Sequence, residues 1–390
     1  MSRAGGGRGI VTWSVSPSHD YVAPLDGLRA VSIVLVVLGH FGLGALFPGT
    51  FGVTVFFFIS GFLITRQLLA EQNETGRIHL GAFLIRRMLR LWPALIVVVP
   101  VAAIINVLAG GTTTTSQVMA GLFYFTNYLA QVQHYNTGPG GMDNPLMVLW
   151  SIAVEQHFYL IFPFVLLTMR NRPRLVAALL AIILGITAWR YDVAGRCVAL
   201  GPACTEGLGA FRTAFSTEMR LDSILYGSLM AILLGTGAAP VLLRLFNAPS
   251  TLVAAIAVVL LSLLIRDPVF RSGLRYTVQG VSLFLGVGCV LFGRPYAWAR
   301  RLLGSRPTVL LGRWSYSLYL WHLVVLAGAL PLLPPDLWRP AILEMRPGLL
   351  WLAVVLPLLT AASVLLAIAS YHLVERPPQQ LRRYLLQPAS

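Results

Sequence analysis

LDGLRAVSIVLVVLGHFG, residues 25–42, is an apolar run in which Arg29 and His40 stand eleven positions apart. About 20 mostly apolar residues cross the hydrocarbon core as a helix, so the run predicts a membrane span. At about 100° per residue, this spacing brings both side chains to within ~20° of one direction and about 16 Å apart along the axis. A snorkelling arginine and a structural histidine would also satisfy the pattern.

The composition of the whole chain indicates a membrane protein. Of its 390 residues, 57% are hydrophobic and 11% are charged, whereas about a quarter of an average globular protein is charged. This much apolar sequence excludes an intrinsically disordered chain and a lone soluble enzyme. The net charge is +15 and all 29 basic residues are arginine, but they punctuate apolar runs, which argues against nucleic-acid binding. We expect an all-α polytopic membrane protein.

Apolar runs long enough for transmembrane helices recur along the chain. We count ten, at residues 24–43, 51–69, 92–109, 145–169, 174–191, 213–235, 250–265, 276–293, 308–330 and 348–373. A further apolar stretch, residues 118–130, is too short to span comfortably and is expected to be re-entrant or interfacial.

The predicted membrane domain covers residues 21–377. Residues 1–20 are rich in Gly, Ser and Arg without an apolar core, so a disordered cytoplasmic tail is expected there and not a signal peptide. Residues 378–390 are expected to be a second cytoplasmic tail. If the N-terminus is inside, nineteen arginines fall in inner segments and eight in outer ones. Because cytoplasmic loops retain arginine, both termini are predicted to be cytoplasmic.

The three cysteines suggest one disulfide. Cys197 and Cys204 lie on a predicted outer loop, CVALGPAC, in a compartment that would oxidise them. A metal pair is the alternative, but neither a histidine nor a third cysteine accompanies them. Cys289 lies in an apolar run and is expected to serve packing.

Ionisable residues within the apolar runs are candidate functional positions, because each costs about 2.5–3.5 kcal/mol at mid-bilayer on insertion scales. Glu155 lies near the middle of the run at residues 145–169, and Ser151 precedes it by four positions on the same helix face. The carboxylate needs a partner. That partner is either an arginine of another helix or His40, which Glu155 would then orient.

Two later segments add polar groups. Asp222 lies in MRLD, and SYSLYLWH places Ser315, Tyr319 and His322 on one helical stripe that a purely lipid-facing helix would not carry. Near the C-terminus, HLVERP places Glu375 at the predicted inner boundary, where the end of a helix before proline explains it adequately.

Three arginines cluster in the predicted inner loop RIHLGAFLIRRMLRLWP. Arg86, Arg87 and Arg90 are helical neighbours and form a compact cationic surface. Positive-inside anchoring explains such a cluster. The alternative is a site for a phosphorylated cytoplasmic cofactor, because guanidinium pairs bidentately with phosphate.

Taken together, these segments resemble acyltransferase family 3, a family of integral membrane O-acyltransferases. The landmarks, in order along residues 25–377, are LDGLRAVSIVLVVLGH, FFFISGFLIT, RRMLRLWP, WSIAVEQHFYL, MRLD, GRWSYSLYLWH and VERP. The resemblance implies transfer of an acyl group, usually acetyl from acyl-CoA, to a hydroxyl of a sugar or sugar-bearing molecule, in a bacterial inner membrane. It points to Arg29 and His40 as indispensable, with Glu155 and the arginine cluster in support.

These assignments fit one mechanism. Arg29, Arg86, Arg87 and Arg90 would hold the coenzyme phosphates at the inner mouth, and neutral His40 would act as general base on the acceptor hydroxyl. Glu155 would fix the tautomer of His40 or stabilise its imidazolium. No metal is expected. The candidates for orienting the acceptor or donating to the oxyanion are Ser151, Asp222, Ser315, Tyr319 and His322.

Three functions remain open. The short build resembles family members that acylate secondary metabolites such as macrolide antibiotics. A second possibility is acyl or succinyl transfer to an extracytoplasmic glycan or lipid-linked sugar. The non-enzyme alternative is a proton-coupled transporter, which would predict inverted repeats or paired broken helices that the sequence does not display.

Overall fold

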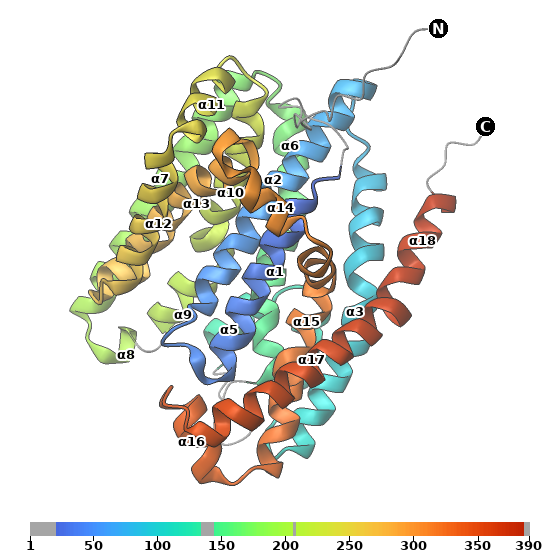
Figure 1. Ribbon diagram of the computed structural model, residues 1–390, viewed down its shortest axis with the longest axis vertical. Helices are drawn as coiled ribbons and strands as arrows, with labels where there is room; N and C mark the ends of the chain where they lie inside the picture. The colour runs from blue at the N-terminus through green and yellow to red at the C-terminus, as the bar shows by residue number, and fades with distance from the viewer. Residues whose placement is uncertain (1–20, 134–143, 206–207, 386–390) are drawn as a thin grey trace, which may run out of the picture.

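The computed structural model describes residues 21–133, 144–205 and 208–385, and within these ranges the chain forms helices and loops without a β-strand (Figure 1). The all-α polytopic fold is therefore confirmed. The predicted tail at residues 1–20 lies outside the described residues. The second predicted tail begins inside a helix, since α18 covers Arg376–Leu385.

In the part of the chain that the structure describes, eight helical segments are long and apolar enough to cross a membrane. They are α1 (Ala23–Leu38) with η1 (Gly39–Leu43), α2 (Gly49–Thr75), α3 (Leu80–Leu108), η3 (Pro145–Leu149) with α6 (Trp150–Thr168), α7 (Arg172–Ala199), η4 (Phe270–Leu274) with α13 (Arg275–Phe292), α15 (Arg306–Ala329) with η6 (Leu330–Leu332), and η7 (Trp351–Val355) with α17 (Leu356–Ser370), η8 (Tyr371–Glu375) and α18.

The other helices are shorter. They are α4 (Thr115–Leu122), α5 (Thr126–Val132), α8 (Pro202–Thr205), α9 (Leu208–Phe215), α10 (Thr217–Leu234), α11 (Ala239–Asn247), α12 (Pro249–Leu264), η5 (Arg294–Tyr296), α14 (Ala297–Leu303) and α16 (Pro335–Ile342). The helix through α10 bends by 112° into α11, and the two count as a ninth span if taken together. Each predicted run coincides with a helix. The count of ten transmembrane helices and the cytoplasmic location of both termini stay predictions.

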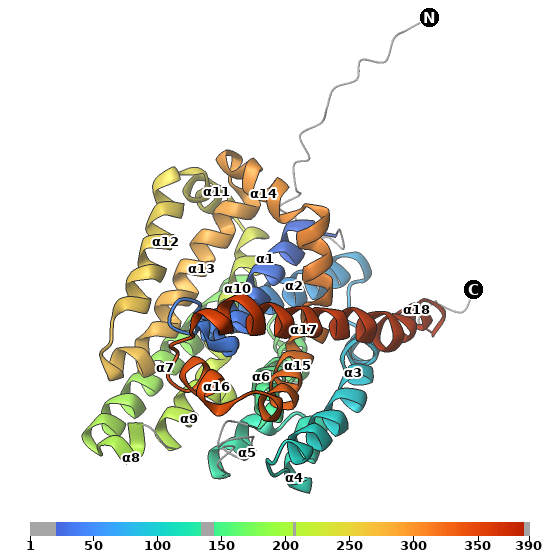
Figure 2. The ribbon, with the colours of Figure 1, turned by 60° about the horizontal axis from the view of Figure 1, so that its bottom comes forward.

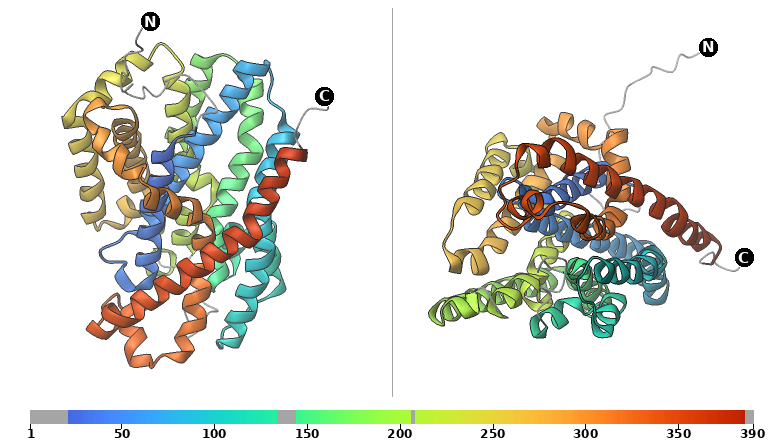
Figure 3. Two further views of the ribbon diagram at one scale, coloured as in Figure 1. Left: turned by 45° about the vertical axis from the view of Figure 1, so that its right-hand side comes forward. Right: turned by 90° about the horizontal axis from the view of Figure 1, so that it is seen from below.

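The helices pack into one bundle with α1, α2 and α10 near its middle (Figures 1 and 3). Helices α7, α12 and α13 cover one side, and α3 lies on the other. Helix α17 continues through η8 into α18 as one long rod that crosses α15 and α3 (Figure 2). The helices that carry Arg29 and Ser315, α1 and α15, run side by side from the same end of the bundle.

The predicted short stretch at residues 118–130 forms two helices and not a span. Helix α4 begins with a capping box between Thr114 and Gln117, and Tyr124, with φ at 62°, breaks the path before α5. At the same end of the bundle, Cys197 and Cys204 form a disulfide with their Cα atoms 5.2 Å apart, which ties α7 to α8.

Glycines set the closest helix contacts. A Cβ added to Gly61 of α2 would collide with the carbonyl oxygen of Ile224 on α10, and one added to Gly227 would collide with Phe58 in the same interface. Small residues let helix backbones approach closely in membranes, where dispersion and not the hydrophobic effect holds helices together.

Replacing Gly61 with leucine should lower the free energy of unfolding by about 3 kcal/mol, because the backbones of α2 and α10 must separate. Gly185→Leu is the matched control, since no heavy atom lies within 4 Å of a Cβ added there. That variant should stay within about 0.5 kcal/mol of the unmodified chain. Thermal unfolding in detergent compares the two, and equal destabilisation would contradict this account of the interface.

Candidate active site

Three cavities follow one another along α1 with η1, α2 and α15, whose residues line all three. The first, here called the arginine cavity, has a volume of about 360 Å³ and lies where α1 begins. Its lining residues are Tyr21, Val22, Leu25, Asp26, Arg29, Leu63, Gln67, Arg90, Arg313, Tyr316, Tyr371, Glu375 and Gln379.

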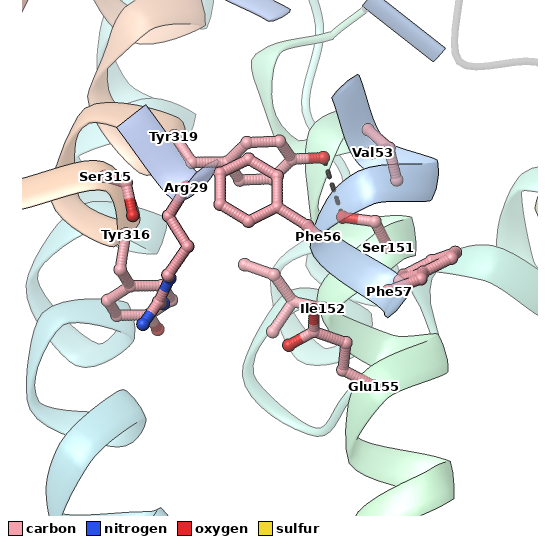
Figure 4. Close-up of a pocket in the computed structure, with 10 residues that line it drawn as sticks. All are labelled: Arg29, Val53, Phe56, Phe57, Ser151, Ile152, Glu155, Ser315, Tyr316 and Tyr319. Atoms are coloured by element: carbon pink, nitrogen blue, oxygen red, sulfur yellow. Dashed lines mark hydrogen bonds between the residues drawn. The ribbon is translucent and has the colours of Figure 1, made fainter. Parts of the chain in front are cut away.

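The second, here called the junction cavity, is much smaller, at about 40 Å³ (Figure 4). It shares Arg29 and Tyr316 with the arginine cavity. Its lining residues are Arg29, Val53, Phe56, Phe57, Ser151, Ile152, Glu155, Ser315, Tyr316 and Tyr319. Four of the candidate polar residues predicted from the sequence, besides Arg29, therefore face one space.

The third, here called the histidine cavity, has a volume of about 460 Å³ and shares Val53 and Tyr319 with the junction cavity. Its lining residues are Gly39, His40, Gly49, Thr50, Val53, Met147, Val148, Trp150, Phe215, Tyr319, Leu323, Leu326, Ile342, Leu343 and Met345. The His40 side chain is exposed and forms part of the wall of this cavity. Because they share lining residues, the three cavities are neighbours in a row from Arg29 to His40.

Helix α1 places Arg29 and His40 at opposite ends of this row. The helix widens into the π-turn η1 at Gly39, and Gly42, with φ at 97°, ends it in a conformation that favours glycine. The indole Nε1 of Trp351 donates a hydrogen bond of 2.9 Å to the Phe41 carbonyl oxygen. This contact fixes the turn that carries His40.

The partner of His40 is a second histidine. Nδ1 of His40 lies 2.9 Å from Nε2 of His322, and the two ring centroids are 5.1 Å apart. On its other side, Nδ1 of His322 lies 2.8 Å from the carbonyl oxygen of Tyr319 and 3.2 Å from that of Leu318. His322 is 0% exposed.

The predicted pairing of Glu155 with His40 is wrong. The Glu155 carboxylate accepts hydrogen bonds from Ser60 Oγ at 3.0 Å and from Tyr159 Oη at 3.2 Å. It lines the junction cavity together with Arg29 (Figure 4), whereas His40 lines the histidine cavity. Helix α6 turns the Glu155 face toward Ser60 of α2, and no local pattern in the sequence specifies that rotation.

The remaining polar groups of the junction cavity come from α6 and α15. Ser151 and Tyr319 hydroxyls lie 2.7 Å apart, and Tyr319 also donates to the Val148 carbonyl oxygen at 3.0 Å. Ser315 is fully buried, and its Oγ has no hydrogen-bond partner among the described residues. A buried hydroxyl without a partner is costly, so this group is available to a ligand in the cavity.

The three predicted phosphate-binding arginines separate in the structure. Arg86 forms an ion pair of 3.3 Å with Glu71, and Arg87 donates to Gln67 Oε1 at 2.6 Å and lies over the Tyr159 ring. Arg90 points into the arginine cavity with Arg29. Across residues 21–133, 144–205 and 208–385, neither of these two guanidinium groups has a hydrogen bond or an ion pair.

Asp222 lies apart from the three cavities, which corrects its predicted place beside the acceptor. It is fully buried and forms a bidentate ion pair with Arg190, with N···O distances of 3.1 and 2.8 Å. Thr277 Oγ1 also donates to its carboxylate, at 3.3 Å. A buried carboxylate in a membrane bundle takes the nearest guanidinium, because an unpaired charge there is costly.

Some lining residues were not identified from the sequence. Tyr316 lines both the arginine and junction cavities and donates to the Leu91 carbonyl oxygen at 2.8 Å. Glu375, interpreted above only as a helix end, is 3% exposed, accepts a hydrogen bond from Ser317 and lines the arginine cavity. The sequence could have indicated Tyr316, because it lies between the candidate residues Ser315 and Tyr319.

The mouth of the arginine cavity holds a small polar cluster. Tyr21 donates a hydrogen bond of 2.6 Å to Asp26, and Arg313 lies 3.4 Å from the Tyr21 hydroxyl. Burial, together with the hydrogen bond to Asp26, raises the pKa of Tyr21. The phenol therefore stays protonated and keeps the Asp26 carboxylate engaged. Among the described residues, no group of three or more His, Cys, Asp or Glu side chains could hold a metal ion.

Asp222→Ala should lower the free energy of unfolding by about 3–5 kcal/mol, because it leaves Arg190 buried and unpaired. The double variant Arg190→Met with Asp222→Leu should recover most of that loss, since apolar residues of similar volume replace both charges. Thermal unfolding measures both effects. A double variant no more stable than the single one would show that the ion pair is not the reason for the loss.

Residues 22–371 match the model of acyltransferase family 3, described as an acyltransferase domain. A protein of Staphylococcus aureus (strain COL), named "Putative O-acetyltransferase", is 31% identical over 322 residues, or 79% of this chain and 51% of that protein. Peptidoglycan O-acetyltransferase OatA of Listeria monocytogenes is 27% identical over 377 residues, or 92% of this chain and 56% of the relative.

The chain thus spans about half the length of these relatives. No solved structure matches it. The family match runs from the beginning of α1 to the first residue of η8 and so includes all the helices that line the three cavities except the end of the α17–α18 rod. On this match, the chain belongs to acyltransferase family 3.

Proposed function

We propose that the chain transfers an acyl group, in the first instance acetyl, from acyl-CoA in the arginine cavity to a hydroxyl of an acceptor in the histidine cavity. The observation that carries the proposal is the row of three cavities, with free guanidinium groups at one end and His40 at the other. The proposed location is a bacterial inner membrane, with the arginine cavity open to the cytoplasm.

The arginine cavity suits a phosphorylated donor. Among the described residues, Arg29 and Arg90 form no hydrogen bond or ion pair, and guanidinium groups pair bidentately with phosphate oxygens. The two carboxylates of the cavity, Asp26 and Glu375, already accept hydrogen bonds from Tyr21 and Ser317. Their charge is thereby partly satisfied, and the free arginines face the ligand.

The distance between the ends fits a long, thin donor. Arg29 and His40 are about 16 Å apart along α1, so phosphates held at Arg29 leave the thioester to be carried inward on the pantetheine arm. The arm passes the junction cavity, where Ser315 Oγ, which has no hydrogen-bond partner among the described residues, can donate to a carbonyl oxygen of the arm.

The proposed reaction is direct transfer. The acceptor oxygen attacks the thioester carbonyl carbon while His40 Nε2 takes its proton, and the tetrahedral intermediate then expels the CoA thiolate. The protonated His40 returns its proton to that sulfur. An ester and a free thiol leave, and His40 is neutral again.

The acceptor site combines apolar walls with few polar groups. Trp150 and Phe215 offer flat surfaces, and Thr50 and His40 offer polar atoms. Aromatic walls suit the apolar faces of a sugar ring or of a macrolide. The name of the Listeria relative indicates a glycan acceptor; a macrolide-type acceptor and succinyl transfer are the alternatives that the assay must compare.

The assay incubates the purified protein in lipid nanodiscs with labelled acetyl-CoA and separate muramyl glycan, lipid-linked sugar and macrolide acceptors. A labelled ester is the expected product, and a proton-coupled transporter would give none. His40→Ala should lower turnover by at least about 10²-fold, the usual contribution of a general base. His372→Ala is the control, because that side chain is exposed on η8 outside the cavities. Ester formation by His40→Ala at a near-normal rate would remove His40 from the mechanism.

Arg90→Gln should raise the KM for acetyl-CoA by about tenfold or more, since a hydrogen bond to a charged group contributes about 1.5–3 kcal/mol. Arg86→Gln should leave this KM nearly unchanged, because Arg86 is bound to Glu71. Initial rates over a range of acetyl-CoA concentrations measure both. Equal effects of the two substitutions on the KM would indicate that general surface charge, and not a binding site for acetyl-CoA at Arg90, attracts the coenzyme.

A further inference from the structure

We infer that His322 is a positioning residue that fixes the tautomer of His40 and so presents an unprotonated Nε2 to the histidine cavity. The inference rests on the proposed function, because it assigns the group that makes His40 a competent base.

The proton on His322 is determined by its backbone neighbours. Nδ1 of His322 lies 2.8 Å from the Tyr319 carbonyl oxygen and 3.2 Å from that of Leu318. Carbonyl oxygens only accept hydrogen bonds, so Nδ1 must carry the hydrogen. The α15 backbone provides these carbonyls one turn before His322, and they do not depend on any titrating side chain.

His322 is neutral in this setting. It is 0% exposed, and the rings that face it are those of His40 and Phe41 from η1 and Tyr319 from its own helix. Within the described part of the chain, no carboxylate pairs with either histidine. A buried charge without a counter-charge is costly. With Nδ1 protonated and the ring neutral, Nε2 of His322 bears a lone pair.

The lone pair on His322 Nε2 determines the tautomer of His40. It faces Nδ1 of His40 at 2.9 Å, so Nδ1 of His40 must be the donor. The neutral His40 ring then has no hydrogen on Nε2, and the exposed His40 side chain that carries this nitrogen lines the histidine cavity. The opposite tautomer would set two lone pairs against each other across the same contact.

The same contact assists His40 after it has taken the acceptor's proton. The imidazolium keeps Nδ1–H on the His322 lone pair, and this hydrogen bond becomes charge-assisted and stronger. His322 itself cannot meet the substrate, because it is enclosed and both of its nitrogens are occupied. The reacting group is therefore His40, and His322 acts through it.

Two substitutions at position 322 separate this role from a role in packing. His322→Gln can place an amide oxygen near the position of Nε2 and accept from His40 Nδ1, but it cannot take up a proton at neutral pH. His322→Phe keeps a ring of similar size and removes the acceptor. We expect His322→Gln to keep kcat within about tenfold of the unmodified protein, and His322→Phe to lower kcat by about 10²-fold or more, as loss of general-base catalysis does. The KM values for the acyl donor and the acceptor should stay within about threefold in both variants, because neither substitution removes a contact that binds a substrate.

A second measurement does not depend on turnover. In protein labelled with ¹⁵N-histidine, the His40 signals are identified by their loss in His40→Ala. We expect a protonated Nδ1 and an unprotonated Nε2 in the unmodified protein and in His322→Gln, and a mixture of tautomers in His322→Phe.

Three results would overturn the inference. They are a kcat for folded His322→Phe within about threefold of the unmodified protein, a His322→Gln variant as slow as His322→Phe, and a protonated Nε2 on His40 in the unmodified protein. Failure of the proposed function looks different. In that case the unmodified protein forms no ester with any acceptor, while the ¹⁵N spectra still report which nitrogen of His40 is protonated.

Discussion

The candidate site depends on how closely α1 approaches α15. A Cβ on Gly312 would collide with the backbone of Asp26, so the two helices touch through main-chain atoms at this level. Such a contact fixes the axial register of two helices more firmly than side chains can, because backbones do not change rotamer. Three residues further along each helix, Arg29 and Ser315 face the same junction cavity. Beyond them, the same pair of helices brings His40 against His322.

The parts of the molecule that follow from local geometry were predictable from the sequence. Apolar runs gave the helices, because an uninterrupted apolar segment has few alternatives to a membrane or core helix. The spacing of Arg29 and His40 gave their common direction, since both belong to one helix of fixed pitch. The disulfide of Cys197 and Cys204 spans only one short loop. All of these involve neighbours in the chain.

The parts that depend on the rotation of one helix against another were not predictable. His40 and His322 are 282 residues apart, and no local pattern connects them. Helices that are apolar on every face do not indicate which face turns inward. From the sequence, Glu155 was expected to pair with an arginine of another helix or with His40, and Asp222 was expected near the acceptor. In the structure, Glu155 accepts hydrogen bonds from Ser60 and Tyr159, and Asp222 pairs with Arg190.

The sizes of the three cavities limit which molecules can pass from one side of the bundle to the other. The junction cavity measures about 40 Å³, against about 360 and 460 Å³ for the spaces on either side. A cavity needs roughly 10–15 Å³ to hold a single water, so the junction has room for a few small groups and not for an acceptor. Phe56 and the hydrogen-bonded pair of Tyr319 and Ser151 line this narrow space. On the proposed route, a thin thioester arm and its acyl group enter from the arginine side, while the acceptor stays in the histidine cavity. The lining of the junction then discriminates between acyl groups, and the walls around His40 discriminate between acceptors.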